Sequence, residues 1–368
     1  MHILVLPNSL KGSLSARQTA RVLCAALQHK HTVKAYPLSD GGDGFIDFFA
    51  TLYPQAQKVY LTVQNAFGKK QRTHYLWLAK QKTAVLETAQ ICGLGKTKKE
   101  ELDPLHASSF GVGEVILQAI KKGAKKIYIG LGGVACNDGG AGIAQALGAQ
   151  FFDKHQQPLK LGAEPLLELT QINLTALKKN LRGIHLYAVA DVTNPMLGLR
   201  GSARVYGPQK GATPAQVRTL EKSLTKYARV AKKTTGIDIG HTPSTAAAGA
   251  LCAGLYGLCG AQIILGAHFL QQHLPLATWT QWADLIITTE GKLDRQTCFG
   301  KAPLAVLQAA SRYQKPVLFI CGMYEENALR HLPKISHMQL VSLIDFAKNQ
   351  ADSIQQASTY IRRAVQGL

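Results

Sequence analysis

Several signatures of common protein classes are missing from this 368-residue sequence. It has no Walker A pattern (G-x-x-x-x-G-K-[ST]), no strand-led G-x-G-x-x-G with an acidic residue downstream, and no HExxH or HxxEH zinc pattern. No apolar run reaches the roughly 18–20 residues that a membrane helix requires. The first residues, MHILVLPNS, lack the basic leader of a signal peptide. We therefore expect a cytoplasmic protein with no membrane partner.

Cysteine is scarce, and the cysteines form no motif. There are seven of them, an odd number, and no two are arranged as CxxC. Several lie within apolar runs, which favours reduced thiols buried in a core over disulfides or a metal site. The seven positions are Cys24, Cys92, Cys136, Cys252, Cys259, Cys298 and Cys321.

Acidic residues are few relative to basic ones. The chain has 42 Lys and Arg against 22 Asp and Glu, a net charge of +20, and a pI near 9.7. Such a surface attracts anions, including nucleic acid and phosphorylated metabolites. The basic clusters at 69–72, 96–99, 121–126 and 178–182 lie at expected turns and helix ends, without the interleaved aromatics that stack bases. The pattern favours a solvated surface and disfavours a nucleic-acid partner.

The order of apolar runs and loops predicts an α/β protein with two domains, the number expected for this length. Near both ends, apolar strands such as 3–6 and 284–288 lead through polar loops into helices, which is typical of a parallel sheet. In the middle, runs at 59–63, 73–78 and 83–87 are separated by turns and predict antiparallel strands.

We therefore predict a discontinuous Rossmann- or flavodoxin-like domain formed by residues 1–80 and 283–368, with a mainly parallel sheet. Residues 81–282 would form an inserted mixed α/β domain. The active site is expected in the cleft between the two, because ligands of open α/β sheets bind beyond the carboxyl ends of the strands.

Glycine-rich polar loops follow five of the expected strands, and their side chains are complementary in charge. Lysines beside glycines and helix starts could bind phosphate; these are Lys11, Lys210 and Lys301. Carboxylates could bind Mg²⁺ or accept a proton; these include Asp40, Asp138, Asp191, Glu290 and Asp294. The alternative for each carboxylate is a helix cap or a charged turn. The residues alone thus indicate an anion- and metal-binding α/β enzyme.

The loops resemble, in the same order along the chain, those of the bacterial glycerate kinase family, the type that includes glycerate 2-kinases. The matching stretches are PNSLKGSLSA (7–16), DGGDG (40–44), SSFGVGEVI (108–116), GLGGVACNDGGAGIAQALG (130–148), ADVTNPMLGLRGSARVYGPQKGATP (190–214) and ITTEGKLDRQTCFGKAP (287–303). These stretches span nearly the whole chain.

The resemblance implies a kinase that transfers the γ-phosphoryl group of ATP to D-glycerate, with Mg²⁺ as cofactor and 2-phosphoglycerate as product. Transferred to this sequence, catalytic roles are expected for Asp40, Asp138 and Asp191, and metal binding for Asp191, Glu290 and Asp294. Phosphate or nucleotide binding is expected for Lys210, Lys301, Gly132, Gly133, Gly139 and Gly140, and substrate binding for Ser9, Lys11 and Asn137.

The sequence also departs from the family pattern. Asn8 stands where an acidic residue is usual, Val134 and Cys136 replace small polar residues, and Thr289 replaces a glycine. Ser244, Ala246 and Ala250 replace glycines in PSTAAAGAL, where added Cβ atoms disfavour a positive φ. Two alternatives therefore stay open: a kinase for another small hydroxy or sugar acid, and a non-catalytic relative that binds a metabolite or polyanion. The oligomeric state is not predicted.

Overall fold

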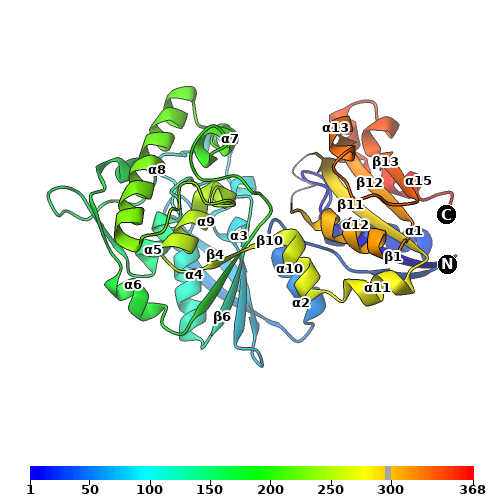
Figure 1. Cartoon of the computed structure of the whole chain (residues 1–368), viewed down its shortest axis with the longest axis horizontal. Helices are drawn as coiled ribbons and strands as arrows, with labels where there is room; N and C mark the ends of the chain where they lie inside the picture. Colours follow the sequence, from blue (N-terminus) through cyan, green and yellow to red (C-terminus); the bar gives the residue numbers. More distant parts are fainter. Residues whose placement is uncertain (295–299) are drawn as a thin grey trace. The chain divides into compact units, whose positions relative to one another are not determined.

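The computed structural model describes residues 1–294 and 300–368. The chain divides into two compact units, which Figure 1 shows in different parts of the colour scale. Unit 1 comprises Met1–Leu52 and Leu265–Leu368, and unit 2 comprises Tyr53–Ile264. One unit is thus discontinuous in sequence and the other is inserted into it. The divisions lie at 52/53 and 264/265, whereas the sequence analysis placed them near 80 and 283.

Strand pairing explains where the division falls. The hairpin of β3 (Gln57–Gln64) and β4 (Lys70–Leu78), expected in the first domain, pairs with β5 (Thr83–Glu87) in antiparallel register. A hairpin belongs to the sheet that completes its hydrogen bonds. The hairpin is therefore part of unit 2, and the predicted antiparallel strands in this region are confirmed.

Unit 1 is built on a parallel sheet whose described strands run in the order β13–β12–β11–β1–β2. In the chain order of this unit alone that is 2-1-3-4-5, the flavodoxin-like order. Its strands are β1 (His2–Pro7), β2 (Thr32–Ala35), β11 (Leu285–Leu293), β12 (Val317–Tyr324) and β13 (Met338–Ser342). Its helices are α1 (Ala16–Leu27), α2 (Phe45–Leu52), α10 (Gly266–His273), α11 (Leu276–Trp282), α12 (Ala302–Arg312), α13 (Glu326–Leu329), η6 (Leu343–Phe346), α14 (Gln350–Gln355) and α15 (Ala357–Ala364).

Strands β1 and β12 consist largely of buried apolar residues because the sheet is covered on both faces. Alternate residues such as Ile3 and Val5 pack with Leu23 of α1 and Ile361 of α15 on one face. Leu4, equally buried, points to the opposite face by the alternation of a strand. Helix α12 contacts β11, α10 and α11 (Figure 1). Helix α1 begins with a capping box between Ser15 and Gln18.

Unit 2 contains a mixed sheet in the order β10–β9–β6–β5–β4–β3, with β5, β6 and β9 parallel. The other strands of this sheet are β6 (Lys126–Leu131), β9 (His185–Ala190) and β10 (Gln262–Leu265), while β7 (Gln150–Phe152) and β8 (Gln171–Asn173) pair with each other in a separate antiparallel ribbon. The helices are α3 (Thr88–Cys92), η1 (Leu94–Lys96), η2 (Lys99–Glu101), α4 (Phe110–Lys121), α5 (Ala141–Ala146), η3 (Glu164–Glu168), α6 (Thr175–Asn180), α7 (Ser202–Tyr206), η4 (Pro208–Lys210), α8 (Pro214–Thr235) and α9 (Ala247–Gly257). The α/β class with one parallel and one mixed sheet is therefore confirmed.

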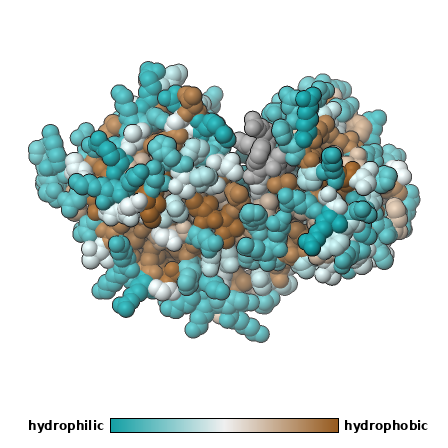
Figure 2. Space-filling view, viewed as in Figure 1, coloured by the Kyte–Doolittle hydropathy of each residue, from teal (hydrophilic) through white to brown (hydrophobic). Residues whose placement is uncertain are grey.

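The surface agrees with the charge pattern of the sequence. Lysines and arginines described in the basic clusters, such as Lys70, Lys122 and Lys179, are exposed. Figure 2 shows hydrophilic side chains over most of the visible face, with apolar ones scattered between them. Of the seven cysteines, Cys298 lies outside the described residues; the other six are free thiols, and of these only Cys24 is not buried. Within the described part of the chain, no helix combines the length and apolar character needed to span a membrane.

The segment PSTAAAGAL (243–251), in which the resemblance led us to expect more glycines, contains an unusual backbone. Ser244, Ala248 and Ala250 have φ of 69°, 54° and 63°, which places three L-residues in the left-handed region. This conformation costs an L-residue about 1–2 kcal/mol of folding free energy, a penalty that glycine does not have. Ala246, by contrast, has φ of −74° and needs no glycine. Two of the three substitutions noted in the sequence, Ser244 and Ala250, thus fall at strained positions.

Replacing Ser244 with glycine should therefore stabilise the protein. Removal of the left-handed strain outweighs the extra chain entropy of glycine, so we expect S244G to raise the free energy of unfolding by about 1 kcal/mol. A246G is the matched control, because glycine gains nothing at a right-handed position and should lower that free energy by about 0.5–1 kcal/mol. Urea unfolding of the wild type, S244G and A246G measures the two changes in the free energy of unfolding. If S244G and A246G were destabilised equally, Ser244 would not be strained.

Candidate active site

The strongest cluster of charged groups in the described structure forms where unit 1 changes strand order. In a 2-1-3-4-5 sheet the chain leaves β1 and β11 in opposite directions, which opens a crevice at their carboxyl ends. The parallel register sets Pro7 opposite Thr289, so the next residues, Asn8 and Glu290, are neighbours. We call Asn8, Asp40, Glu290, Asp294 and Lys301 the Asn8 cluster.

Asn8 joins two carboxylates through one amide group. Its Nδ2 donates to Asp40 Oδ2 at 3.2 Å and to Glu290 Oε2 at 3.1 Å. The three side chains come from the ends of β1 and β11 and from the loop after β2. All three are nearly buried, at 5–6% exposure. Because each carboxylate shares the same neutral donor, the pair is held together with less repulsion than two unbridged anions would have.

Lys301 supplies the positive charge of the cluster. Its Nζ lies 3.9 Å from Glu290 Oε1 and 3.8 Å from Asp294 Oδ1. It immediately precedes α12, where the backbone N–H of Ala302 donates to Asp40 Oδ2 at 3.2 Å. Asp40 therefore also stabilises the amino end of this helix from a distant loop, as a negative charge there does.

The pKa of Glu290 is raised to about 7, mainly because the side chain is buried and in addition because of the charge of Asp40. Lys301 and the amide of Asn8 act in the opposite direction. A carboxylate with a pKa near neutrality is suited to accept and release a proton at physiological pH.

Backbone contacts bring the loop after β1 against β11. Thr289 Oγ1 donates to the carbonyl of Asn8 at 2.7 Å, and a Cβ at Gly291 would lie 2.8 Å from the backbone nitrogen of Lys11. Only glycine permits that approach. Lys11 is exposed and lines a cavity of about 360 Å³ together with Glu290, Asp294 and Lys301, whereas Ser9 is half-buried in the same loop.

The second group of predicted site residues lies in unit 2, and its buried carboxylate, Asp138, is hydrogen-bonded to groups of the same unit. Asp138 is fully buried and accepts hydrogen bonds from the N–H and Oγ of Ser109, at 2.7 and 2.9 Å. It also accepts the backbone N–H groups of Gly140 and Gly142, both at 3.2 Å. Burial nevertheless raises the pKa of this carboxyl. The geometry favours the capping interpretation, because Asp138 organises the starts of α4 and α5.

Lys210 serves the same loop. Its buried Nζ donates to the carbonyl of Cys136 at 2.6 Å and to Asn137 Oδ1 at 3.0 Å. Burial lowers its pKa to about 8. A Cβ at Gly249 would lie 2.5 Å from this Nζ, so the left-handed turn packs directly on the ammonium group. Nδ2 of Asn137, by contrast, is a buried donor without an acceptor in the described part of the chain.

The glycines of this loop serve turns and packing. Gly139 and Gly140 have φ of 66° and 76°, and Cβ atoms there would lie within 2.8 Å of Tyr227 and Leu251 respectively. Gly133 also has a positive φ, of 59°, and Gly132 donates its N–H to Thr88 Oγ1 at 3.2 Å. Asp191 follows β9 in unit 2 and is half-buried.

The structure thus divides the predicted residues between its units. Asp40, Glu290, Asp294 and Lys301 are brought together in unit 1, with Ser9 and Lys11 beside them. Asp138, Asn137 and Lys210 form a separate network in unit 2 together with the glycines. Asn8 was noted in the sequence only as a departure from the family, yet it is central to the first cluster. Its position directly after an apolar strand was the available signal.

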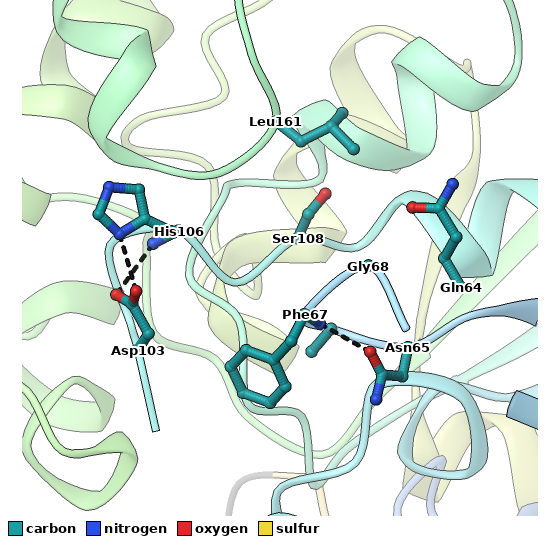
Figure 3. A pocket seen from close by; sticks show the side chains of 9 residues that line it. Gln64, Asn65, Phe67, Gly68, Asp103, His106, Ser108 and Leu161 are labelled. Atoms are coloured by element: carbon teal, nitrogen blue, oxygen red, sulfur yellow. Dashed lines mark hydrogen bonds and ion pairs between the residues drawn. The ribbon is translucent and has the colours of Figure 1, made fainter. Parts of the chain in front are cut away.

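A hollow of about 300 Å³ in unit 2 is lined by polar side chains that the sequence analysis did not propose as site residues (Figure 3). At its edge, His106 Nδ1 lies 2.8 Å from Asp103 Oδ2, and its Nε2 lies 3.0 Å from Glu164 Oε2. These carboxylates, Asp103 first, raise the pKa of His106. Asn65 and Ser108 line the same hollow, and Asp103 and His106 lie on a loop without a recognisable motif.

Lys210 should leave a signature in the pH dependence of stability. Its pKa is about 8 in the folded chain against the ordinary lysine value of 10.5 once unfolding exposes it to water. Between these values the unfolded chain binds more protons, so stability rises with pH. We expect K210M to lose that rise, about 3 kcal/mol at most. Urea unfolding from pH 7 to 10.5 measures this rise in the free energy of unfolding. Lys222→Met, at an exposed position, is the control and should keep the rise. A wild-type slope retained by K210M would contradict the assignment.

Comparison with known proteins places these features in a family. The model of the glycerate kinase family matches residues 3–368. A glycerate kinase of Halalkalibacterium halodurans is 35% identical over 87% of this chain and 85% of its own length. A glycerate 2-kinase of Escherichia coli is 36% identical over 88% and 85%. A crystal structure assigned to glycerate kinase 2 of Salmonella typhimurium superposes with a TM-score of 0.77 at 33% identity, covering 100% of this chain and 98% of the other.

Proposed function

The chain belongs to the glycerate kinase family, and we propose that it transfers the γ-phosphoryl group of ATP to the 2-hydroxyl of D-glycerate with the Asn8 cluster as its catalytic centre. The observation that supports this most directly is the convergence of two carboxylates, an amide and a lysine at the switch point of a parallel sheet. Phosphoryl transfer depends mainly on in-line positioning and on neutralising oxygen charge. An ammonium group, carboxylates and a base with a pKa near 7 are sufficient for that.

Glu290 is the proposed general base. Its pKa of about 7 lets it accept the proton of the attacking hydroxyl at neutral pH, whereas Asp138 has its oxygens occupied by internal donors. Asp40 holds Asn8 and the start of α12, and so positions the base. Lys301 and Lys11 are proposed to bind phosphate oxygens or the glycerate carboxylate, with Ser9 beside them.

The donor set is compatible with Mg²⁺. Among residues 1–294 and 300–368, no group of three or more His, Cys, Asp or Glu side chains is arranged to hold a metal by itself. Mg²⁺ needs only one or two carboxylates when phosphate oxygens and waters complete its shell. We propose that Asp294, beside Lys301, would hold the ion, with phosphate oxygens and waters as the other oxygen donors, so that Glu290 stays free to act as the base. A bound ion would neutralise charge on the phosphates.

The decisive experiment is identification of the product. Incubation with Mg·ATP and D-glycerate should yield 2-phosphoglycerate, in which ³¹P couples to the single C2 proton and not to the C3 protons. A panel of other hydroxy and sugar acids tests the alternative acceptors. Coupling to the C3 protons would overturn the proposed position, and absence of any phosphorylated acid would overturn the proposed activity.

The proposed base predicts a pH-dependent rate. Because Glu290 must be ionised to accept a proton, kcat/KM should rise with pH and level off above its pKa of about 7. E290Q removes the base and should lower kcat by about 10²–10⁴-fold. Glu326→Gln, at an exposed position in α13, is the matched control and should retain wild-type kinetics. A fully active E290Q enzyme would exclude this residue as the base.

A further inference from the structure

The 360 Å³ cavity at the Asn8 cluster has two chemically different sides. Its charged side carries Lys11, Glu290, Asp294 and Lys301, from the loops that follow β1 and β11. Its other side lies toward β12 and the segments after β13, because the sheet order is β13–β12–β11–β1. There the wall is apolar and is formed by Met323, Leu343, Ile344, Ile354 and Ala357.

This apolar side is larger than glycerate requires. Every carbon of glycerate carries an oxygen, so a small hydroxy acid has no surface that would favour an aliphatic wall over water. Ile354 is nevertheless 41% exposed at this wall, while Met323 and Ile344 are half-buried. An exposed apolar wall that continues into a charged pocket is typical of a site for an amphipathic ligand.

A nucleoside triphosphate has the matching distribution of charge. Its phosphates are polyanionic and suit Lys11 and Lys301, while its base is planar and largely apolar on both faces. The cavity volume lies within the range of ligand pockets, roughly 300–1,000 Å³. We propose that the wall formed by Met323, Ile344 and Ile354, all in unit 1, binds the purine base of ATP. This proposal rests on the proposed kinase function.

Two polar groups stand at the edge of this wall. Ser353 is buried at 6% exposure, and Gln350 begins α14; both line the cavity. A glutamine amide can donate and accept a hydrogen bond at the same time. The edge of adenine carries a matching acceptor and donor, its ring nitrogen and its amino group. The base is therefore held on its faces by the aliphatic side chains and at its edge by Gln350.

The test is equilibrium binding of ATP and of inorganic tripolyphosphate, which lacks the base, by calorimetry. Ile354→Asn removes apolar contact without adding charge, so it should weaken ATP binding by about tenfold, as expected for a loss of about 1.4 kcal/mol. Its affinity for tripolyphosphate should change by less than about twofold. Val205→Asn is the matched control, because Val205 is also 41% exposed but lies in α7 of unit 2, and it should change neither affinity.

Unchanged ATP binding by I354N, or equal weakening of ATP and tripolyphosphate, would overturn the base site. Because ATP binding is measured without an acceptor, the result of the binding experiment does not depend on whether the protein phosphorylates glycerate. If I354N weakens only ATP while wild-type protein phosphorylates no acid, the base site stands and the proposed function fails. If glycerate is phosphorylated but I354N binds ATP normally, the function stands and the base lies elsewhere.

Discussion

The parallel pairing of β1 with β11 is the constraint on which the proposed catalytic centre depends. These strands are separated by more than the whole of unit 2 in sequence, yet Leu6 lies opposite Thr288 and Pro7 opposite Thr289. Hydroxyls of Thr288 and Thr289 reinforce the register by donating to the backbone carbonyls of Leu6 and Asn8, at 2.9 and 2.7 Å. A shift of one residue would turn Glu290 to the opposite face of the sheet. The proposed chemistry is therefore a direct consequence of strand register.

The two loop systems that look alike in sequence differ in how their polar groups are used. In unit 2, Asp138 and Lys210 form hydrogen bonds with the backbone and side chains of their own loop and of neighbouring segments. In unit 1, Lys301 and Asp294 keep 14% and 20% of their side chains exposed, and they line a cavity. Buried, satisfied groups stabilise a fold, whereas partly exposed charges beside a cavity can exchange partners with a ligand. The glycine-rich composition alone does not distinguish these cases.

Local features could be predicted from the sequence because their causes are local. The capping box of Ser15 and Gln18 and the start of α8 at Thr213 and Pro214 depend on neighbouring residues, and both are present in the structure. The division of the chain depended instead on which sheet would pair with the β3–β4 hairpin. The bond from the N–H of Ala302 to Asp40 joins residues 262 apart, and no local pattern indicates it. Resemblance to a family indicated which loops matter, but not which of their side chains are buried by internal partners.

An amide side chain at position 8, where the resemblance led us to expect an acidic residue, gives the cluster a particular electrostatic balance. An aspartate at this position would put a third carboxylate within about 3 Å of Asp40 and Glu290, and each unit-charge contact at 4 Å costs about 4 kcal/mol at an effective dielectric constant of 20. Such a trio would require a cation or a proton to stay together. The amide instead donates to both carboxylates and adds no charge. Asn8 therefore holds Asp40 and Glu290 together without adding a further carboxylate in contact with them, and the pKa of Glu290 in this buried position is about 7.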